Sequence, residues 1–389
     1  MRPRRRVTPD AGPQCGGRRF TVTLRRGNMP AALSGNSSSR FMFRHCVLLS
    51  AALLGAAVLT PSPVLAETAG TQAMARGDYV RAVRELLVAA KAGDRQAQYE
   101  LGLAYRDGKG IGRNPAQAFR WFRQAAEKDL PEAQYEVGQM EEDGDGTEKN
   151  AADAAEWYRK AATSGNVPAM FALGELYRNG EGVAKDEQQA IRWYRPAADK
   201  NDIDSQLALG KLYQQGVGTP KNPSEAAVWF RKAAQLGSPE GSYLLALLLI
   251  DADPAVHSMG HGPSRASVEA MTLLRSAAGQ NYAPAQFYLG MAHLKGIEAR
   301  LDDGEAVARL LSAADQGYAD ALHQLGRMYQ QGRGVPQDPV RAYMYLELAF
   351  EMGDESAGPD REDSAHAMRA GAVQLATRRA QEWVQARGL

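Results

Sequence analysis

Few side chains of this sequence have the types and the spacing that a catalytic or metal site needs. His257 and His261 are four residues apart, which is the spacing of two zinc ligands on one face of a helix. Gly260, Gly262 and the neighbouring prolines disfavour a helix there, and no HExxH glutamate accompanies the pair. We therefore predict a loop at residues 251–262, with a metal site, or a hydrolase that uses this insertion, as the alternative.

An acidic run offers a second pattern with the chemistry of a cation site. Asp143 and Asp145 match the first two ligands of an EF-hand loop, but Glu148 stands at position six and Ala154 at position twelve. A solvated turn is the better interpretation of this run. No Ser/His/Asp motif and no nucleophile elbow is found in the sequence. The sequence therefore predicts a non-catalytic protein without a cofactor.

The chain is organised by a block of about 36 residues that recurs almost to its end. Repeats of this length are typical of solenoids, in which neighbouring units stack into one continuous core. The copies occupy residues 97–132, 133–168, 169–204, 205–240, 285–320 and 321–356, and a degenerate copy at 241–284 has eight additional residues.

Each copy begins with the pattern of a helix of about ten residues, which we term helix A. Alanine, a central Leu-Gly pair and often a tyrosine recur at spacings that lie on one helix face. Glycine inside a helix costs about 1 kcal/mol relative to alanine, so its recurrence predicts close packing against another element. The glycine column comprises Gly102, Gly138, Gly174, Gly210, Gly290 and Gly326, with Ala246 in the degenerate copy.

A Gly-x-Gly pair, such as Gly108 and Gly110, follows helix A in five copies. A phosphate-binding loop of this kind would need a strand before it and a helix directly after it. Here a helix precedes the pair and the phase is the same in each of these copies. We therefore predict a turn.

A second helix, helix B, is predicted to begin twelve residues after the aligned glycine. Asn and Asp are favoured N-caps, and proline follows them in three copies. Alanine at position 4 from the cap, large apolar residues at positions 7 and 8, and an alanine pair at positions 11 and 12 form a buried stripe. Gly, Asn or Asp at position 15 tolerates the left-handed conformation that closes a helix. The predicted caps are Asn114, Asn150, Asp186, Asn222, Asp302 and Asp338, with Asp78 in phase upstream.

Position 7 of helix B is tryptophan in four copies: Trp121, Trp157, Trp193 and Trp229. Such a column could stack against sugar rings or peptides. Because it is in phase with the buried alanine stripe, we predict that it belongs to the core.

The two ends of the repeat array differ from its middle. Residues 67–96 hold a partial repeat with a complete helix B after Asp78. Residues 357–389 are predicted to form a linker and a C-terminal capping helix, whose apolar side covers the last repeat.

Together these columns resemble the Sel-1-like repeat family, a branch of the tetratricopeptide superfamily, over roughly residues 78–353. The shared pattern is Ala-x3-Leu-Gly-x2-Tyr, Gly-x-Gly, then Asn/Asp-x3-Ala-x2-Trp-Tyr-x-Lys-Ala-Ala-x2-Gly. Copies 241–284 and 285–320 depart most from it, since the first lacks the glycine and both lack the tryptophan. The resemblance implies an all-α fold, a right-handed α-solenoid of stacked helix-turn-helix repeats. It also implies an adaptor that holds peptides or partner proteins, and secreted bacterial members are associated with envelope signalling, exopolysaccharide production and host interaction.

The N-terminal residues predict export. Residues 42–66 have the features of a signal peptide, with Arg44 and His45 before the apolar stretch 47–59 and cleavage after Ala66. The apolar stretch is too short to cross the roughly 30 Å of membrane hydrocarbon as a helix. We therefore expect a periplasmic or secreted protein with no stable membrane span after cleavage, and an uncleaved anchor is the alternative.

Residues 1–41 form either a disordered basic leader or an over-extended start, with translation beginning at Met29 or Met42 rather than Met1. Residues 1–66 hold ten Arg, no Lys and one acidic residue, so the rest of the chain has 36 basic and 44 acidic residues. Its net charge of about −8 is a poor match for nucleic acid. Both cysteines lie in the segment predicted to be removed, which leaves no thiol for metal binding or catalysis.

The remaining candidate for recognition is a variable polar ridge on helix A, at positions −2, +1 and +4 from the aligned glycine. A spacing of three places these side chains on one face, and in tetratricopeptide relatives helix A lines the concave groove. We expect a protein or peptide partner there, with ordinary solvated surface as the alternative for each residue and polysaccharide binding as the alternative function. The predicted binding residues are Gln139, Glu142, Glu175, Arg178, Lys211, Gln214, Arg327 and Gln330.

Overall fold

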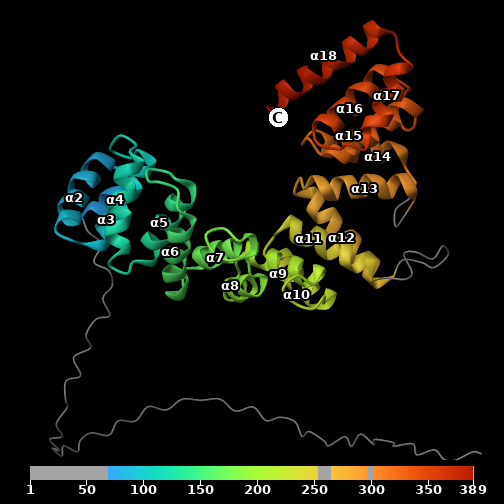
Figure 1. Ribbon diagram of the computed structural model, residues 1–389. Coiled ribbons are helices and arrows are strands. Elements are labelled where there is room, and N and C mark those ends of the chain that lie inside the picture. The colour runs from blue at the N-terminus through green and yellow to red at the C-terminus, as the bar shows by residue number, and fades with distance from the viewer. Residues whose placement is uncertain (1–68, 253–263, 297–300, 389) are drawn as a thin grey trace, which may run out of the picture. The chain divides into compact units, whose positions relative to one another are not determined.

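The computed structural model describes residues 69–252, 264–296 and 301–388. These residues form eighteen α-helices, and no strand occurs among them (Figure 1). The predicted leader and signal peptide, and the histidine pair at His257 and His261, lie outside the described residues.

Helices A and B alternate along the described chain, as the repeat pattern predicts. Helices A are α3 (Arg95–Asp107), α5 (Pro131–Asp143), α7 (Val167–Asn179), α9 (Ile203–Gln215), α11 (Pro239–Asp251), α13 (Ala283–Lys295) and α15 (Ala319–Gln331). Helices B are α2 (Tyr79–Lys91), α4 (Pro115–Ala126), α6 (Ala151–Thr163), α8 (Glu187–Asp199), α10 (Pro223–Gln235), α12 (Arg265–Gly279), α14 (Asp303–Ala314) and α16 (Pro339–Glu351). The three others are α1 (Ala69–Ala75), α17 (Ala357–His366) and α18 (Ala370–Arg387).

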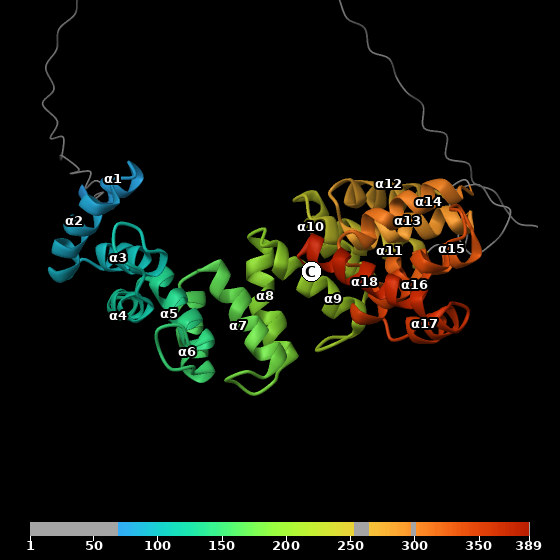
Figure 2. The same ribbon diagram turned by 90° about the horizontal axis from the view of Figure 1, so that it is seen from above.

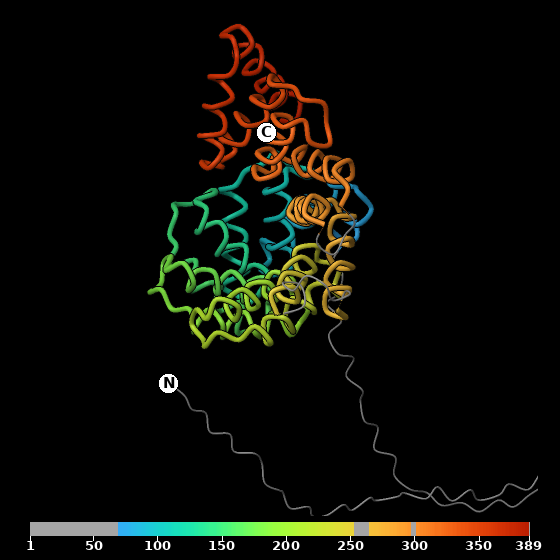
Figure 3. Tube along the Cα trace, turned by 90° about the vertical axis from the view of Figure 1, so that its right-hand side faces the viewer, coloured from blue at the N-terminus to red at the C-terminus, as the bar shows by residue number. Residues whose placement is uncertain are grey.

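The helices stack in chain order. Each helix A packs against the helix B of its own repeat, and that helix B packs against the next helix A. Figures 2 and 3 show the same order along the trace from α1 to α16. The main contacts of each unit are therefore with its two neighbours, which is the packing of a solenoid and confirms the predicted all-α solenoid.

The predicted ends of helix B are confirmed by hydrogen bonds and backbone angles. All seven predicted caps accept a hydrogen bond from a backbone N–H two or three residues later. At position 15, Asp129, Asn201 and Asn281 have φ of 56°, 67° and 62° and are the non-glycine residues with positive φ in the described part. Short polar side chains thus substitute for glycine where the chain turns between helices.

The predicted core columns are also confirmed. The alanine at position 4 is fully buried in all eight helices B. The aligned glycine faces the large side chain at position 8. A Cβ atom placed on Gly174 would lie 2.4 Å from Cε1 of Tyr194, and one on Gly102 would lie 2.6 Å from Cδ1 of Phe122. The glycine therefore makes room between helices A and B for the side chain at position 8, which is aromatic in these two repeats and leucine opposite Gly290 and Gly326.

Replacing Ala190 with leucine is expected to lower the free energy of unfolding by about 1–3 kcal/mol, because extra methyl groups overpack a closed core. Ala190 is fully buried on α8 beside Tyr194 in one cluster. Urea denaturation followed by circular dichroism measures the change. Ala184→Leu, on an exposed position of the preceding loop, is the control. An unchanged midpoint for Ala190→Leu would mean that this column is not a tight helix contact.

The Gly-x-Gly turn has two separate steric roles. The first glycine ends helix A in the left-handed conformation, as at Gly180 with φ of 79°. The second glycine packs against the beginning of the preceding helix B. A Cβ on Gly182 would lie 2.1 Å from the carbonyl oxygen of Ala151, and one on Gly146 would lie 2.4 Å from the carbonyl carbon of Pro115. The prediction of a turn is confirmed, and neighbouring repeats fill the space around it.

A column of buried glutamines, which the sequence analysis did not single out, joins four of the helices A to the helix B before them. In each case Nε2 donates to a backbone carbonyl eight residues earlier, near the C-terminus of that helix B, where carbonyls lack partners within the helix. The pairs are Gln98 with Ala90, Gln134 with Ala126, Gln206 with Ala198, and Gln286 with Ala278, at 3.0, 3.2, 3.0 and 3.4 Å.

Three boundaries differ from the predictions. Helix A begins two residues before each predicted block, as at Arg95 after the N-cap Asp94. The residues before Asp78 form α1, a shortened helix A in which a Cβ on Gly70 would lie 2.7 Å from Cγ of Leu86. At the other end, the predicted linker is helical, since α17 begins at Ala357 and a short break precedes α18.

Candidate functional site

The structure places the eight predicted ridge residues on α5, α7, α9 and α15. We term the surface that carries the ridge the helix-A face. Five of the eight line two adjoining hollows on α5, α7 and α9: Gln139, Glu142, Glu175, Arg178 and Lys211. The other three, Gln214, Arg327 and Gln330, line neither hollow.

The first hollow crosses α5, α7 and α9 and has a volume of about 450 Å³. Its walls combine aromatic and polar side chains, which is the composition of surfaces that bind peptides. The lining residues are Tyr135, Gln139, Glu142, Tyr158, Pro168, Phe171, Ala172, Glu175, Asp202 and Asp204.

The second hollow, of about 240 Å³, continues across α7 and α9 to the first turn of α11. Phe171, Glu175 and Asp204 line both hollows, and we term the two adjoining hollows together the depression. The second adds two of the three cations of the predicted ridge, Arg178 and Lys211.

Two carboxylates of the depression are fixed by buried tyrosines. The hydroxyl of Tyr158 on α6 donates to Oε2 of Glu142 at 2.6 Å, and that of Tyr194 on α8 donates to Oε1 of Glu175 at 2.5 Å. Burial, followed by these hydrogen bonds, raises the pKa of both phenols well above the ordinary value. Glu142 and Glu175 therefore hold helices A and B together as well as facing the depression.

The two cations of the depression are paired. Arg178 donates to Glu175 within α7, and Nζ of Lys211 lies 2.7 Å from Oε1 of Glu240 on α11. Within the described residues, Asp204 has no such partner. Desolvation, followed by the negative charges of Asp202, Glu240 and Glu175, raises the pKa of Asp204. Asp204 is the carboxylate of the depression most open to an incoming positive charge.

The tyrosine–glutamate pairs predict a specific loss of stability at alkaline pH. A phenol whose folded pKa lies above its unfolded value of about 10 stabilises the fold fully below that pH, and the stabilisation is lost as the pH rises above it. We expect the double variant Tyr158→Phe, Tyr194→Phe to lose less stability than the wild type between about pH 8 and about pH 11.

Urea denaturation at each pH measures this difference. Tyr79→Phe, which removes a hydroxyl from a tyrosine that is 40% exposed on α2, is the matched control. Parallel curves for the double variant and the wild type would contradict the assignment of the alkaline loss to these two tyrosines.

An aromatic column three residues before the aligned glycine was missed by the sequence analysis. Tyr135 and Phe171 belong to it, and each ring centroid lies 5.7 Å from the ring at position 8 of the same repeat. In each pair the ring at position 8, Tyr158 or Tyr194, belongs to the buried core. The ring on helix A, Tyr135 or Phe171, packs against that core and also lines the depression. The signal was present as Tyr99, Tyr135, Phe171, Tyr243 and Phe287 at fixed phase.

Three ridge residues lie outside the depression. Two of them make contacts with other parts of the chain. Arg327 on α15 lies 3.7 Å from Asp360 of α17, and the backbone carbonyl of Gln330 accepts a hydrogen bond from the side chain of Gln337. Gln214 on α9 is half-buried. The ridge is thus not one continuous site.

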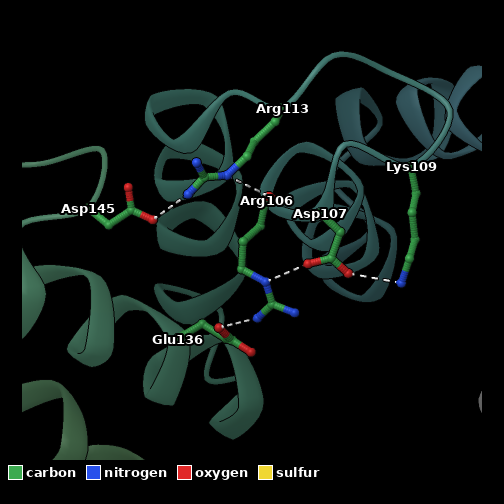
Figure 4. A network of polar contacts seen from close by, with 6 residues as sticks. All are labelled: Arg106, Asp107, Lys109, Arg113, Glu136 and Asp145. Carbon is green, nitrogen blue, oxygen red and sulfur yellow. Dashed lines mark hydrogen bonds and ion pairs between the residues drawn. The ribbon is translucent and has the colours of Figure 1, made fainter. Parts of the chain in front are cut away.

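On α3 the equivalent ridge position is neutralised by ion pairs (Figure 4). Arg106 bridges Asp107 at 2.9 Å and Glu136 of α5 at 2.7 Å. Arg113, in the turn after α3, lies 3.5 Å from Asp145 of the next turn. These charges form ion pairs that join the first two complete repeats. The carboxylate of Asp204 forms no such ion pair among the described residues.

On α11 and α13 the ridge positions become apolar. Leu244 and Leu247 of α11, and Tyr288 and Met291 of α13, are half-buried there. Tyr288 and Met291 also line a smaller cavity of about 90 Å³. We term these four residues the apolar end of the helix-A face.

The tryptophan column lies between repeats, as predicted for core residues. Trp229 is 2% exposed, and Trp121, Trp157 and Trp193 pack half-buried against the core of the preceding repeat. A sugar ring would need an open aromatic face, so this packing counts against the tryptophans as a glycan platform.

The regular repeats match the sequence profile of the Sel1 repeat at residues 95–130, 131–166, 167–202, 203–238, 283–318 and 319–354. Together the matches cover more than half of the 389 residues. The chain belongs to the Sel1 repeat family. Every matched Sel1 repeat begins at the first residue of its helix A, so the family unit and the helical hairpin coincide.

The segment between the fourth and fifth matched Sel1 repeats still forms a hairpin, of α11 and α12. Ala246 replaces the aligned glycine there, and α12 is capped by Ser264, whose side chain accepts from the N–H of Ser267. The described chain therefore holds seven complete hairpins, six of them recognisable Sel1 repeats.

Among solved structures, a Sel1 repeat protein from Oxalobacter formigenes is similar, with 28% identity and a TM-score of 0.61. The alignment covers 76% of this chain and 86% of that one. Protein c5321, a protective antigen of uropathogenic Escherichia coli that displays an SLR fold, has 27% identity and a TM-score of 0.39 over 79% and 80% of the two chains. The immunity protein Pa5087 from Pseudomonas aeruginosa has 25% identity and a TM-score of 0.38 over 57% and 81%.

No curated protein matches the sequence. Among the described residues, no helix has the length and the apolar character that a membrane crossing requires. Sel1 repeats serve as scaffolds for interactions between proteins, and this chain is accordingly a protein-interaction scaffold.

Proposed function

We propose that this Sel1 repeat protein is a non-catalytic adaptor of the bacterial envelope that holds a partner protein in the depression across α5, α7 and α9. The observation that carries the proposal is the depression itself, where aromatic rings line a hollow that also contains the free carboxylate of Asp204. Aromatic side chains beside a few polar groups supply the contact area and the orientation that peptide binding needs.

The export part of the proposal rests on the sequence. The apolar stretch at residues 47–59, after Arg44 and His45, has the composition of a signal peptide. By resemblance to secreted family members, the adaptor would serve envelope signalling or exopolysaccharide production. N-terminal sequencing of the protein purified from its native cells tests export. A mature protein beginning at Glu67 in the periplasmic fraction supports it, and a cytoplasmic protein with an intact N-terminus contradicts it.

Site-specific photo-crosslinking in native cells tests the surface. Gln139 is half-buried in the first hollow and has no fixed side-chain partner among the described residues, so a photoreactive residue there leaves the fold intact. Val228, 44% exposed on α10, is the matched position on a helix B. A discrete protein adduct at position 139 that is absent at position 228 supports the depression. Adducts at 228 alone would place binding on the opposite helices and overturn the proposal.

Charge reversal of Glu142 or Arg178 is a poor test of binding. Glu142 accepts a hydrogen bond from the buried Tyr158, and Arg178 pairs with Glu175. Either reversal would disturb the packing of helices A and B and so weaken binding indirectly. Asp204→Asn and Gln139→Ala change the depression without breaking a contact of this kind.

A further inference from the structure

We infer that the depression selects a basic peptide: an arginine or lysine side chain of the partner enters beside Asp204, and neighbouring apolar side chains lie on the apolar end of the helix-A face. This inference rests on the proposed function and adds the chemistry of the partner.

The charges of the depression favour a cation. Two cations, Arg178 and Lys211, line the two hollows, and each is paired with a carboxylate. Five carboxylates line them: Glu142, Glu175, Asp202, Asp204 and Glu240. The excess of negative charge lies where the surface is hollowed and water is partly displaced, which strengthens its attraction for a positive group.

The excess of negative charge is concentrated around Asp204. Asp204 lines both hollows, and desolvation, followed by the charges of Asp202, Glu240 and Glu175, raises its pKa against the opposing charge of Lys211. A guanidinium or ammonium group at this point would relieve the repulsion and form a charge-assisted hydrogen bond. An acidic peptide or a phosphate would add to the repulsion.

Aromatic and apolar surface lies where the stem of a basic side chain would pass. Phe171 lines both hollows, and Tyr135 lines the first. Arginine and lysine bury their methylene stems against such surface and make favourable contacts with ring faces. The site is therefore built for a long cation and is more than a cluster of acids.

The apolar end of the helix-A face is the surface that the apolar residues of the peptide would contact. Leu244 and Leu247 occupy on α11 the ridge positions that Ala208 and Lys211 occupy on α9. Leu247 is half-buried and belongs to no core cluster of the described residues. Leu247, a half-buried leucine outside the core clusters on the helix A that follows α9, fits a peptide in which basic and apolar residues are neighbours.

A displayed library of random dodecapeptides, selected on the purified full chain, tests the inference. We expect enriched sequences to hold at least one arginine or lysine next to apolar residues. An enriched peptide is then synthesised with a fluorophore, together with a copy in which glutamine replaces each basic residue, and fluorescence anisotropy gives the Kd of both. We expect the basic peptide to bind at least tenfold more tightly than its glutamine copy, and to bind more weakly as ionic strength rises.

Two pairs of matched variants locate the binding. Asp204→Asn should weaken binding of the basic peptide about tenfold, while Glu181→Gln, an exposed carboxylate of the α7–α8 turn, should not change it. Leu247→Ser should weaken it several-fold, while Val228→Ser on α10 should not. Circular dichroism and the melting temperature confirm that each variant is folded.

The outcomes separate the two proposals. Enriched peptides that lack basic residues but lose affinity with Gln139→Ala would overturn the choice of a cation and leave the proposed function standing. If the Kd of the basic peptides is unchanged by Asp204→Asn, the peptides bind elsewhere, and the inference is also overturned. A selection without enrichment, together with no crosslink at position 139 in cells, would overturn both.

Discussion

Replacing Gly182 with alanine is expected to lower the free energy of unfolding by about 2–5 kcal/mol, because two costs add. The residue has φ of 68°, where a side chain is strained, and the new Cβ would lie 2.1 Å from the carbonyl oxygen of Ala151. Backbone atoms form this obstacle, so α6 and the turn after α7 would have to separate. Urea denaturation gives the loss, and hydrogen exchange should show it concentrated in α6–α8.

Gly237→Ala separates the two costs. Gly237 has φ of 89°, but a Cβ there would meet nothing within 4 Å. Its replacement should therefore show the backbone cost alone, about 1–2 kcal/mol. If Gly182→Ala and Gly237→Ala lost the same stability, the contact between the turn and the preceding helix B would not be a tight one.

The second large effect is a coupling between Gly210 and Phe230. A Cβ on Gly210 would lie 2.3 Å from Cε1 of Phe230, which is fully buried. Gly210→Ala should therefore lower the free energy of unfolding by about 1–3 kcal/mol, although alanine is the better helix former. The double variant Gly210→Ala, Phe230→Leu should lose less stability than the sum of the two single losses, with a coupling energy of about 1–2 kcal/mol in a double-mutant cycle.

The degenerate repeat already combines alanine in the glycine column with leucine at position 8. Ala246 stands in the glycine column there, and the buried Leu274 stands at position 8. The control is the same cycle with Gly210→Ala and the distant Phe122→Leu, which should be additive. Additive losses in the Gly210–Phe230 cycle would show that helix A can shift away from the ring at no cost.

The repeat columns made most of this fold predictable from the sequence. Caps such as Asn114, the alanines at position 4 and the left-handed Asp129 each act through local geometry, which is the same in every copy. Where a copy departed from the pattern, prediction was weaker. The shortened helix α1 lacks the Gly-x-Gly turn, and no Gly or Pro marks the break between α17 and α18.

The candidate site was only partly predictable for a physical reason. The ridge rule identified five residues of the depression by their helical phase. Whether a charge on that ridge is free depends on which long side chain reaches it from another helix, and this is not a local property. Tyr194 reaches Glu175 from α8, and Lys211 reaches Glu240 from α11. Asp204, the carboxylate left without such a partner, lies outside the ridge positions and was missed.

The stacking of each hairpin on its neighbours has an evolutionary consequence. Deleting residues 167–202 would join Asn166 to Ile203, and Asn166 already caps α7 as Asp202 caps α9. The same contacts would then form between α6 and α9 as now form between α6 and α7. Gene duplication or loss of single 36-residue units can therefore lengthen or shorten this protein and reshuffle its recognition surface while the hydrophobic interior is kept.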